Sequence, residues 1–367
     1  MDYKVRFVNY SLQYKNLERE IDEAIKKVLS EGQLILRQDV ERFEKSLAEF
    51  LGVRHVVGVN SGTDALIFAL KAASIGFLDE VITVSHTFWA SIEAVVHVGA
   101  KPVLIEVGED FVMDPARIED AITEKTKAIL PVHYNGRACD MGRIMEIAQK
   151  HNFFVIEDAA QALGAMYNNQ KAGSFGIAGC FSFYPAKILG SAGDGGAVST
   201  NDDQIAERVR LLRSHGIKSK TEIVSYGFTS RLHNLQAAVL NVKLPHVQKW
   251  VERRREIANL YSQGLKDVEG IQLPPSVEER PHYDVFQNYV LRAQKRNELA
   301  AYLEERGVET LIKDPVANHK HPKLGLDHFS LPYTERLAEE VISLPMYPEL
   351  INEEVQYVIE QVRNFYG

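Results

Sequence analysis

Short apolar segments alternate with helical patterns through the first half of this chain. The apolar segments, each typical of a buried strand, are residues 56–59, 81–84, 102–105, 128–132 and 153–156. The helical patterns before and between them cover residues 17–30, 63–73, 90–98, 115–121 and 141–150. Apolar strands separated by helices pair in parallel, and the helices cover both faces of the sheet. The alternation therefore predicts an α/β fold.

This rhythm changes beyond residue 175. Two further strands are expected at 180–183 and 196–199, with little room for a helix between them, so the predicted sheet is mixed but mostly parallel. A strand and two helices near the C-terminus predict a small α+β domain. We expect a large domain over residues 1–250 and a small domain over residues 251–367. The remaining predicted elements are helices at 202–214 and 231–268, a strand at 285–291, and helices at 296–306 and 353–365.

Composition excludes several classes of protein. Net charge is −8 with no long run of one sign, so a nucleic-acid partner, which needs a clustered basic face, is not expected. No apolar run reaches the roughly 18 residues of a membrane span. The two cysteines, Cys139 and Cys180, form no CxxC motif, and the N-terminus lacks the apolar core of a signal peptide. These features predict a cytoplasmic protein without a metal site.

Lys187 is a candidate nucleophilic amine. It ends the segment from Cys180 to Lys187 (Cys-Phe-Ser-Phe-Tyr-Pro-Ala-Lys), and Gly-Asp-Gly-Gly follows at residues 193–196. The apolar and aromatic neighbours would desolvate the amine, which lowers its pKa towards that of a nucleophile. The alternative is an ordinary solvated lysine.

Asp158 is a candidate acid for the same site. It follows the apolar strand 153–156 directly, and ligands of open parallel sheets bind at the carboxyl ends of the strands. A carboxylate there can pair with the protonated nitrogen of a pyridine ring in a bound cofactor. The alternative is the N-cap of a helix, where aspartate is also favoured.

The segment Ser61-Gly62-Thr63-Asp64 lies between a strand and a helix and is a candidate phosphate cradle. Free amides at a helix N-terminus bind phosphate, and the Ser182 hydroxyl could add to them. Plain helix capping by Ser61, and an inert sheet position for Ser182, are the alternatives. An amine, an acid and a phosphate cradle are together the parts that hold pyridoxal phosphate (PLP).

Aromatic and histidine residues leave further choices open. Trp89 could stack on the PLP ring or pack in the core. His133 and His215 are interpreted as structural residues or as residues at the edge of a substrate site, since no spacing supports a metal.

In combination these motifs resemble the DegT/StrS-type sugar-nucleotide aminotransferases, which have the aspartate-aminotransferase-like PLP fold (fold type I). The resemblance covers essentially the whole chain. It is carried by Ser-Gly-Thr-Asp-Ala-Leu from Ser61, Glu-Asp-Ala-Ala-Gln from Glu157, the Lys187 segment, Ser-Arg-Leu from Ser230, and Ser-Leu-Pro-Met-Tyr-Pro from Ser343.

The resemblance implies roles for individual residues. Lys187 would form the Schiff base with PLP, Asp158 would face the ring nitrogen, and Gln161 would lie near the ring hydroxyl. Other implied cofactor contacts are Gly62, Thr63 and Ser182 on the phosphate, Trp89 on the ring and Thr229 across a homodimer with shared active sites. Arg231 and Lys313 are candidate contacts for a phosphate or carboxylate of the substrate, since both are cations near the proposed site segments; the alternative for each is a solvated surface charge. Tyr184 is a further candidate substrate contact.

The chain also departs from the family pattern. Thr229 stands where asparagine is common, which puts the contact across the dimer in doubt. The segment Ile312-Lys313-Asp314-Pro315 replaces a common Ile-His-Tyr-Pro, which leaves room for an unusual substrate. Arg37 and Gln38 stand where glycine is frequent.

The function implied by the resemblance is amino transfer from glutamate to a nucleotide-linked keto-sugar in amino-sugar biosynthesis. Ser230-Arg-Leu, in place of Tyr-Arg-Met, favours carbon 3 over carbon 4. Alternatives are a cyclitol or other cyclic ketone as substrate, and a PLP-dependent sugar dehydratase, although relatives with that chemistry carry histidine at the lysine position. A non-catalytic binding or regulatory protein is the alternative from another class.

Overall fold

The structure, a computed structural model, describes residues 3–367. Its central element is a seven-stranded sheet in the order β1-β9-β8-β5-β4-β2-β3. The strands from β3 to β8 in this order are parallel, and β9 is antiparallel to both of its neighbours. The predicted mixed, mostly parallel sheet is confirmed. The strands are β1 His55–Val59, β2 Glu80–Val84, β3 Lys101–Ile105, β4 Thr126–Ile129, β5 Phe154–Asp158, β8 Ala178–Ser182 and β9 Gly196–Thr200.

Strand direction decides where functional residues gather. Because β9 is antiparallel to both β1 and β8, β1 again runs parallel to β8. The carboxyl ends of β1, β2, β4, β5 and β8 therefore meet at one edge of the sheet, where ligands of α/β proteins bind.

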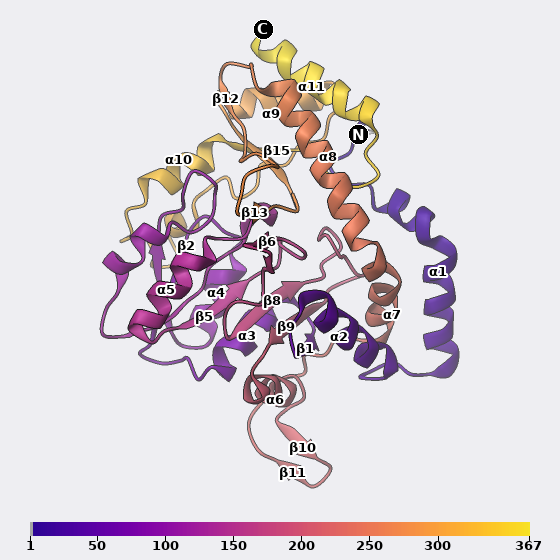
Figure 1. The fold of residues 1–367 in the computed structure, drawn as a ribbon, viewed down its shortest axis with the longest axis vertical. Coiled ribbons are helices and arrows are strands. Elements are labelled where there is room, and N and C mark those ends of the chain that lie inside the picture. The colour runs from indigo at the N-terminus through magenta and orange to yellow at the C-terminus, as the bar shows by residue number, and fades with distance from the viewer. Residues whose placement is uncertain (1–2) are drawn as a thin grey trace.

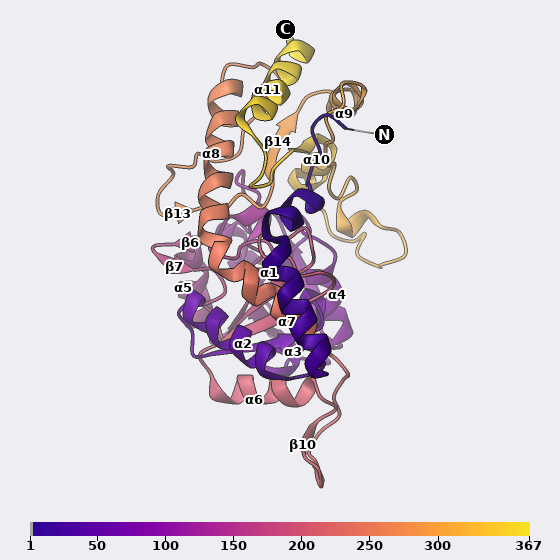
Figure 2. The same cartoon turned by 90° about the vertical axis from the view of Figure 1, so that its right-hand side faces the viewer.

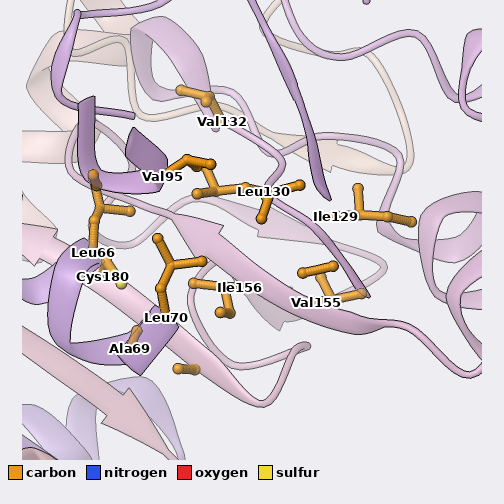
Figure 3. Close-up of a cluster of buried hydrophobic side chains, with 14 of the residues drawn as sticks. Leu66, Ala69, Leu70, Val95, Ile129, Leu130, Val132, Val155, Ile156 and Cys180 are labelled. Atoms are coloured by element: carbon orange, nitrogen blue, oxygen red, sulfur yellow. The ribbon is translucent and has the colours of Figure 1, made fainter. Parts of the chain in front are cut away.

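Helices cover both faces of the sheet, as expected for a largely parallel sheet (Figures 1 and 2). Alternate residues of one strand enter different clusters: Val56 packs with the first helices of the chain, and Val57 packs on the other side. Figure 3 shows the second side, where Leu70 lies beside Ile156 in a cluster that also contains Leu66 and Ile129. One face carries α1 Tyr10–Glu31, α2 Gln38–Leu51 and α7 Asn234–Lys243, and the other carries α3 Gly62–Ala72, α4 Ala90–His97, α5 Met141–His151 and α6 Asp203–Leu212.

The C-terminal part has its own small antiparallel sheet, in the order β12-β14-β15. The long helix α8 (Val247–Leu265) joins the two parts: Val251 packs with the large-sheet side, and Ile257 packs with the C-terminal cluster (Figure 1). The division proposed at residue 250 thus falls inside a continuous helix. Other elements here are β12 Ile271–Gln272, β14 Tyr289–Ala293, α9 Arg296–Glu305, α10 Pro332–Glu340, β15 Val341–Leu344 and α11 Asn352–Tyr366.

Several elements differ from the sequence expectation. Residues 115–121 form two short 3₁₀-helices, η1 Pro115–Arg117 and η2 Glu119–Ala121, in place of one α-helix. The helix expected over 231–268, with an interruption at Pro245, is divided by η4 (Leu244–His246), which contains Pro245, so this break agrees with the expectation. Short pairings were not predicted at all: β6 Met166–Tyr167, β7 Gln170–Lys171 and β13 His282–Tyr283, and the hairpin of β10 Ile217–Ser219 and β11 Glu222–Ile223.

Within residues 3–367, no helix is both long enough and apolar enough to cross a membrane.

Candidate active site

Asp158 lies at the carboxyl end of β5, buried and hydrogen-bonded at both oxygens. Its Oδ2 accepts the Ser91 hydroxyl at 2.7 Å, and its Oδ1 accepts the Ala160 amide at 3.1 Å. Ser91 Oγ is in turn 2.8 Å from Thr87 Oγ1. No helix follows Asp158 in residues 159–165, so it does not cap one. The two donors therefore fix the orientation of the Asp158 carboxylate.

The neighbouring Glu157 has different hydrogen-bond partners from Asp158. It points away from Asp158, as alternate strand residues do, and accepts the amides of Gly173 and Gly176 at 2.7 and 2.8 Å. It also pairs with His133 Nε2 at 2.9 Å, while His133 Nδ1 accepts the Cys139 amide at 3.0 Å. Since Nδ1 is an acceptor, the ring proton is on Nε2 and is donated to Glu157. His133 is therefore structural.

The candidate phosphate cradle forms where α3 meets the end of β8. Ser61 caps α3 by accepting the Asp64 amide at 3.1 Å. The amides of Gly62 and Thr63 belong to the first turn, where helix donors have no partner four residues earlier. A Cβ on Gly62 would lie only 2.8 Å from Ser182 Cβ, so the backbone here must approach Ser182 closely. Amide donors and a hydroxyl thus converge at a helix N-terminus, which suits a phosphate group.

Lys187 lies on the loop after β8, and its amide donates to the Tyr184 carbonyl at 2.9 Å. Desolvation lowers the pKa of its amine, and the negative charge of Asp158 acts in the opposite direction. The amine and the carboxylate therefore lie close enough to interact electrostatically. A lowered pKa increases the fraction of neutral amine, which is the nucleophilic form.

Lys313 lies close enough to Lys187 for their charges to interact. Its pKa is lowered to about 7, first by desolvation and then by the positive charge of Lys187, while Asp314 and Asp158 oppose the shift. Its Nζ is 4.5 Å from the centroid of the Tyr134 ring, and the Tyr134 hydroxyl donates to Asp314 Oδ2 at 2.9 Å. This lysine is thus no solvated surface charge, which was the alternative from sequence.

His86 was missed from the sequence. It follows the carboxyl end of β2, is buried, and its Nε2 has no hydrogen-bond partner in residues 3–367. Burial and then the charge of Lys313 lower its pKa to about 3, so the imidazole is neutral. The ring packs edge-on to Tyr134 at 5.0 Å. Its position after an apolar strand was the one available signal.

Two further candidate cofactor residues have structural contacts. Trp89 is partly buried and packs against the cluster of Ile92, Leu104, Leu326 and Leu331. The Gln161 Oε1 atom accepts the Asn135 amide at 3.0 Å. Stacking by Trp89 and a ring-hydroxyl contact by Gln161 stay proposals.

The remaining candidates lie nearer the surface. Thr229 is exposed, and its Oγ1 is 2.6 Å from His215 Nε2 at the base of the β10–β11 hairpin. Ser230 is buried and donates to Asp64 Oδ2 at 2.7 Å, which brings the following Arg231 next to the start of α3. Tyr184 is 53% exposed.

These residues fit PLP. A desolvated amine, a buried carboxylate with fixed orientation and a helix N-terminus in close contact with Ser182 supply the three groups that the cofactor requires.

Comparisons with known proteins agree with this geometry. The model of the DegT/DnrJ/EryC1/StrS aminotransferase family matches residues 15–363. The chain is 43% identical to a pleiotropic regulatory protein of Geobacillus stearothermophilus, covering 99% of this chain and 98% of the relative. It is 42% identical to dTDP-3-amino-3,4,6-trideoxy-alpha-D-glucose transaminase of Streptomyces venezuelae, covering 99% and 96%.

Solved structures give the same result. The crystal structure of S. venezuelae DesV, determined with a ketimine intermediate, matches with a TM-score of 0.96 and 41% identity, covering 99% of this chain and 98% of that one. NtdA of Bacillus subtilis, solved with bound cofactor PMP, matches with a TM-score of 0.89 and 29% identity, covering 95% and 82%. The chain therefore belongs to the DegT/DnrJ/EryC1/StrS family of PLP-dependent aminotransferases.

Proposed function

We propose that this aminotransferase moves an amino group from glutamate to carbon 3 of a nucleotide-linked keto-sugar, for amino-sugar biosynthesis. The observation that carries the proposal is the electrostatic interaction of Lys187 with Asp158, together with the close approach of the α3 N-terminus to Ser182. The name of the S. venezuelae relative specifies a 3-amino sugar, and the sequence Ser230-Arg-Leu also favours carbon 3.

The chain's own residues divide the chemistry among them. PLP, when bound, supplies an aldehyde for the amino group in transit and a ring that accepts electrons. Lys187 Nζ accepts the proton from the amino-bearing carbon of glutamate and returns a proton, and it repeats these steps in reverse with the keto-sugar. Asp158, held by Ser91 and Ala160, faces the ring nitrogen. Gly62, Thr63 and Ser182 bind the phosphate.

Lys313 and Arg231 are the proposed contacts for anionic groups of the substrates, and Tyr184 is a further substrate contact. Lys313 is supported by its place beside Lys187, and Arg231 by its proximity to the start of α3. Both side chains offer donors that suit carboxylate or phosphate oxygens. The same Lys313-Asp314 pair keeps a cyclitol or other cyclic ketone as the second candidate substrate, because it replaces His-Tyr of the family pattern.

The proposal includes a homodimer with shared active sites in the cytoplasm. The β10–β11 hairpin extends from the body of the protein (Figures 1 and 2), and it and the following residues expose apolar side chains, including Ile223 at 72% and Tyr226 at 100%. Exposed apolar groups of this kind suit a protein interface. Cys139 and Cys180 are both unpaired and buried, as expected in a reducing compartment.

The test uses purified protein loaded with PLP, glutamate, and a panel of dTDP- and UDP-linked 3-keto and 4-keto sugars, with cyclic ketones as a second panel. We expect the 3-amino sugar as product, identified by mass spectrometry and NMR, and no product with Lys187→Ala. A Lys187→Ala variant that turns over normally would contradict the mechanism. Product only from the cyclic ketones would favour the second candidate, and no spectral response to glutamate would indicate a non-catalytic binder.

A further inference from the structure

The side chain of Gln287 forms hydrogen bonds with the backbone on both sides of Lys187. Its Oε1 accepts the amide of Ile188 at 2.9 Å, and its Nε2 donates to the carbonyl of Ala186 at 2.7 Å. The side chain is only 6% exposed, so water competes little for these bonds. One amide side chain thus fixes the two peptide groups that flank the reactive lysine.

Gln287 is itself held in place by its surroundings. Arg254 Nη1, from α8, donates to the carbonyls of Phe286 at 3.1 Å, Gln287 at 3.2 Å and Met346 at 3.0 Å. A Cβ on Gly136 would lie 2.7 Å from the Gln287 amide nitrogen, so the chain passes close on that side as well. The hydrogen bonds to the Lys187 peptide groups therefore come from a closely packed segment of the C-terminal region, which is far from Lys187 in sequence.

The Lys187 loop needs such support because it lies outside helices and strands. Its internal bonds include the Lys187 amide to the Tyr184 carbonyl at 2.9 Å. A lysine side chain has four rotatable bonds, so the position of its backbone limits where its amine can reach. Misplacement of a catalytic group by about 1 Å can cost about 10²-fold in rate.

We propose that Gln287 is a positioning residue for amino transfer, which holds the Lys187 backbone so that the amine reaches the carbon that loses its proton. This inference rests on the proposed role of Lys187 as the proton carrier. The amide side chain of Gln287 offers both the acceptor for Ile188 and the donor for Ala186. An ionised glutamate keeps the acceptor alone, and leucine keeps neither.

The test compares Gln287→Leu and Gln287→Glu with the wild type. We expect kcat to fall by about 10–100-fold in Gln287→Leu and also to fall in Gln287→Glu, whose carboxylate cannot donate to the Ala186 carbonyl, with little change in the KM for glutamate. The kinetic isotope effect with α-deuterated glutamate should increase, because proton transfer becomes slower relative to other steps. A second readout is the rate at which apo-protein captures PLP on Lys187, followed by borohydride fixation and mass spectrometry, which should be slower in both variants.

A matched control is available on the same loop. Gln236 Oε1 accepts the Ala192 amide at 3.1 Å, a glutamine–backbone bond that does not flank Lys187. Gln236→Leu should keep kcat within about twofold of the wild type, since it leaves the Lys187 peptide groups bound.

The outcomes are distinct. If wild-type protein captures no PLP on Lys187, the proposed function itself is wrong. If it does, and kcat and PLP capture in both Gln287 variants match those of the Gln236 control, only the role of Gln287 is overturned. Should Gln287→Leu fail to fold, Gln287→Glu with an unchanged melting temperature decides the question.

Discussion

Asp158 depends on a neighbouring hydroxyl for its place in the site. The Ser91 hydroxyl donates to Oδ2 at 2.7 Å in a buried setting, and hydrogen bonds to buried charged groups contribute about 1.5–3 kcal/mol. We predict that Ser91→Ala lowers the free energy of unfolding of the apo-protein by that amount, measured by urea denaturation. Thr87→Val removes a hydroxyl that contacts Ser91 but not Asp158, and it should cost less. An equal cost in both variants would contradict a special role for the Ser91–Asp158 bond.

Lys313 makes stability depend on pH. Its folded-state pKa of about 7 lies below the value of about 10.4 expected for an unfolded lysine, so the unfolded chain binds more protons between these values. Stability should therefore rise as pH increases from about 7 to about 10. Burial and then the charge of Lys187 lower the pKa of this amine, and Asp314 and Asp158 oppose the shift. His86 and Tyr134 also interact with Lys313.

The measurement is the difference in melting temperature between Lys313→Met and wild-type apo-protein. The methionine variant should gain most at about pH 6.5, where the wild type buries a charged amine, and less at about pH 9.5. Lys320→Met is the control, since Lys320 is exposed on the same segment and pairs with Glu335 at 2.9 Å. A difference that does not change with pH would mean that Lys313 is not desolvated.

Residues of the site differ in how well sequence identifies them. Lys187, Asp158 and Gly62 belong to local sequence motifs, and the residue types in each motif indicate its chemical role. Ser91 and His86 lack such motifs, because their importance comes from contacts with residues far away in the chain.

At the scale of elements, the start of β9 supports the N-terminus of α3. A Cβ on Gly196 would collide with the Ser61 carbonyl and lie 2.8 Å from the Gly62 amide nitrogen. We predict that Gly196→Ala lowers the free energy of unfolding by about 1–3 kcal/mol, since an added carbon in a tight contact must displace backbone. It should also weaken PLP binding, because α3 would move away from Ser182. Urea denaturation and PLP titration measure the two effects.

Gly76→Ala is the matched control for this prediction. The nearest heavy atom to its added Cβ, the Val98 carbonyl oxygen, is 3.4 Å away, so little needs to move. Equal losses in the two variants would show that the close approach of β9 to α3 is not the cause.

Elements with strong periodicity were predictable, and elements that depend on distant partners were not. The apolar strands and α3, α4 and α5 follow from local pattern. Residues 115–121 were expected as an α-helix, but they form two separate short 3₁₀-helices. The pairing of β6 with β13 joins Met166 to Tyr283, a partner that no local pattern could indicate.

At the scale of the whole molecule, substitutions in the exposed β10–β11 hairpin and the residues after it can test the proposed dimer. We predict that the double variant Ile223→Asp and Tyr226→Asp is monomeric in sedimentation velocity, while the wild type is dimeric, because charges in an apolar interface are costly to desolvate. Its aminotransferase activity should fall with the loss of the partner. Leu324→Asp, at a residue that is 42% exposed, is the control and should leave the dimer intact. A monomeric wild-type protein would contradict the proposal.

The sequence by itself determined the class of fold and the cofactor. Both follow from local features: the alternation of apolar strands with helices, the aspartate at the end of a strand, and the glycine at the start of a helix. Each of these features is compatible with only a few structures. Only the tertiary structure decided that Lys313 interacts with both Lys187 and His86, and that Gln287, from a segment much later in the chain, holds the backbone of Lys187. Desolvation and hydrogen-bond partners depend on which distant segments meet, and that is fixed by packing of the folded chain rather than by the order of its residues.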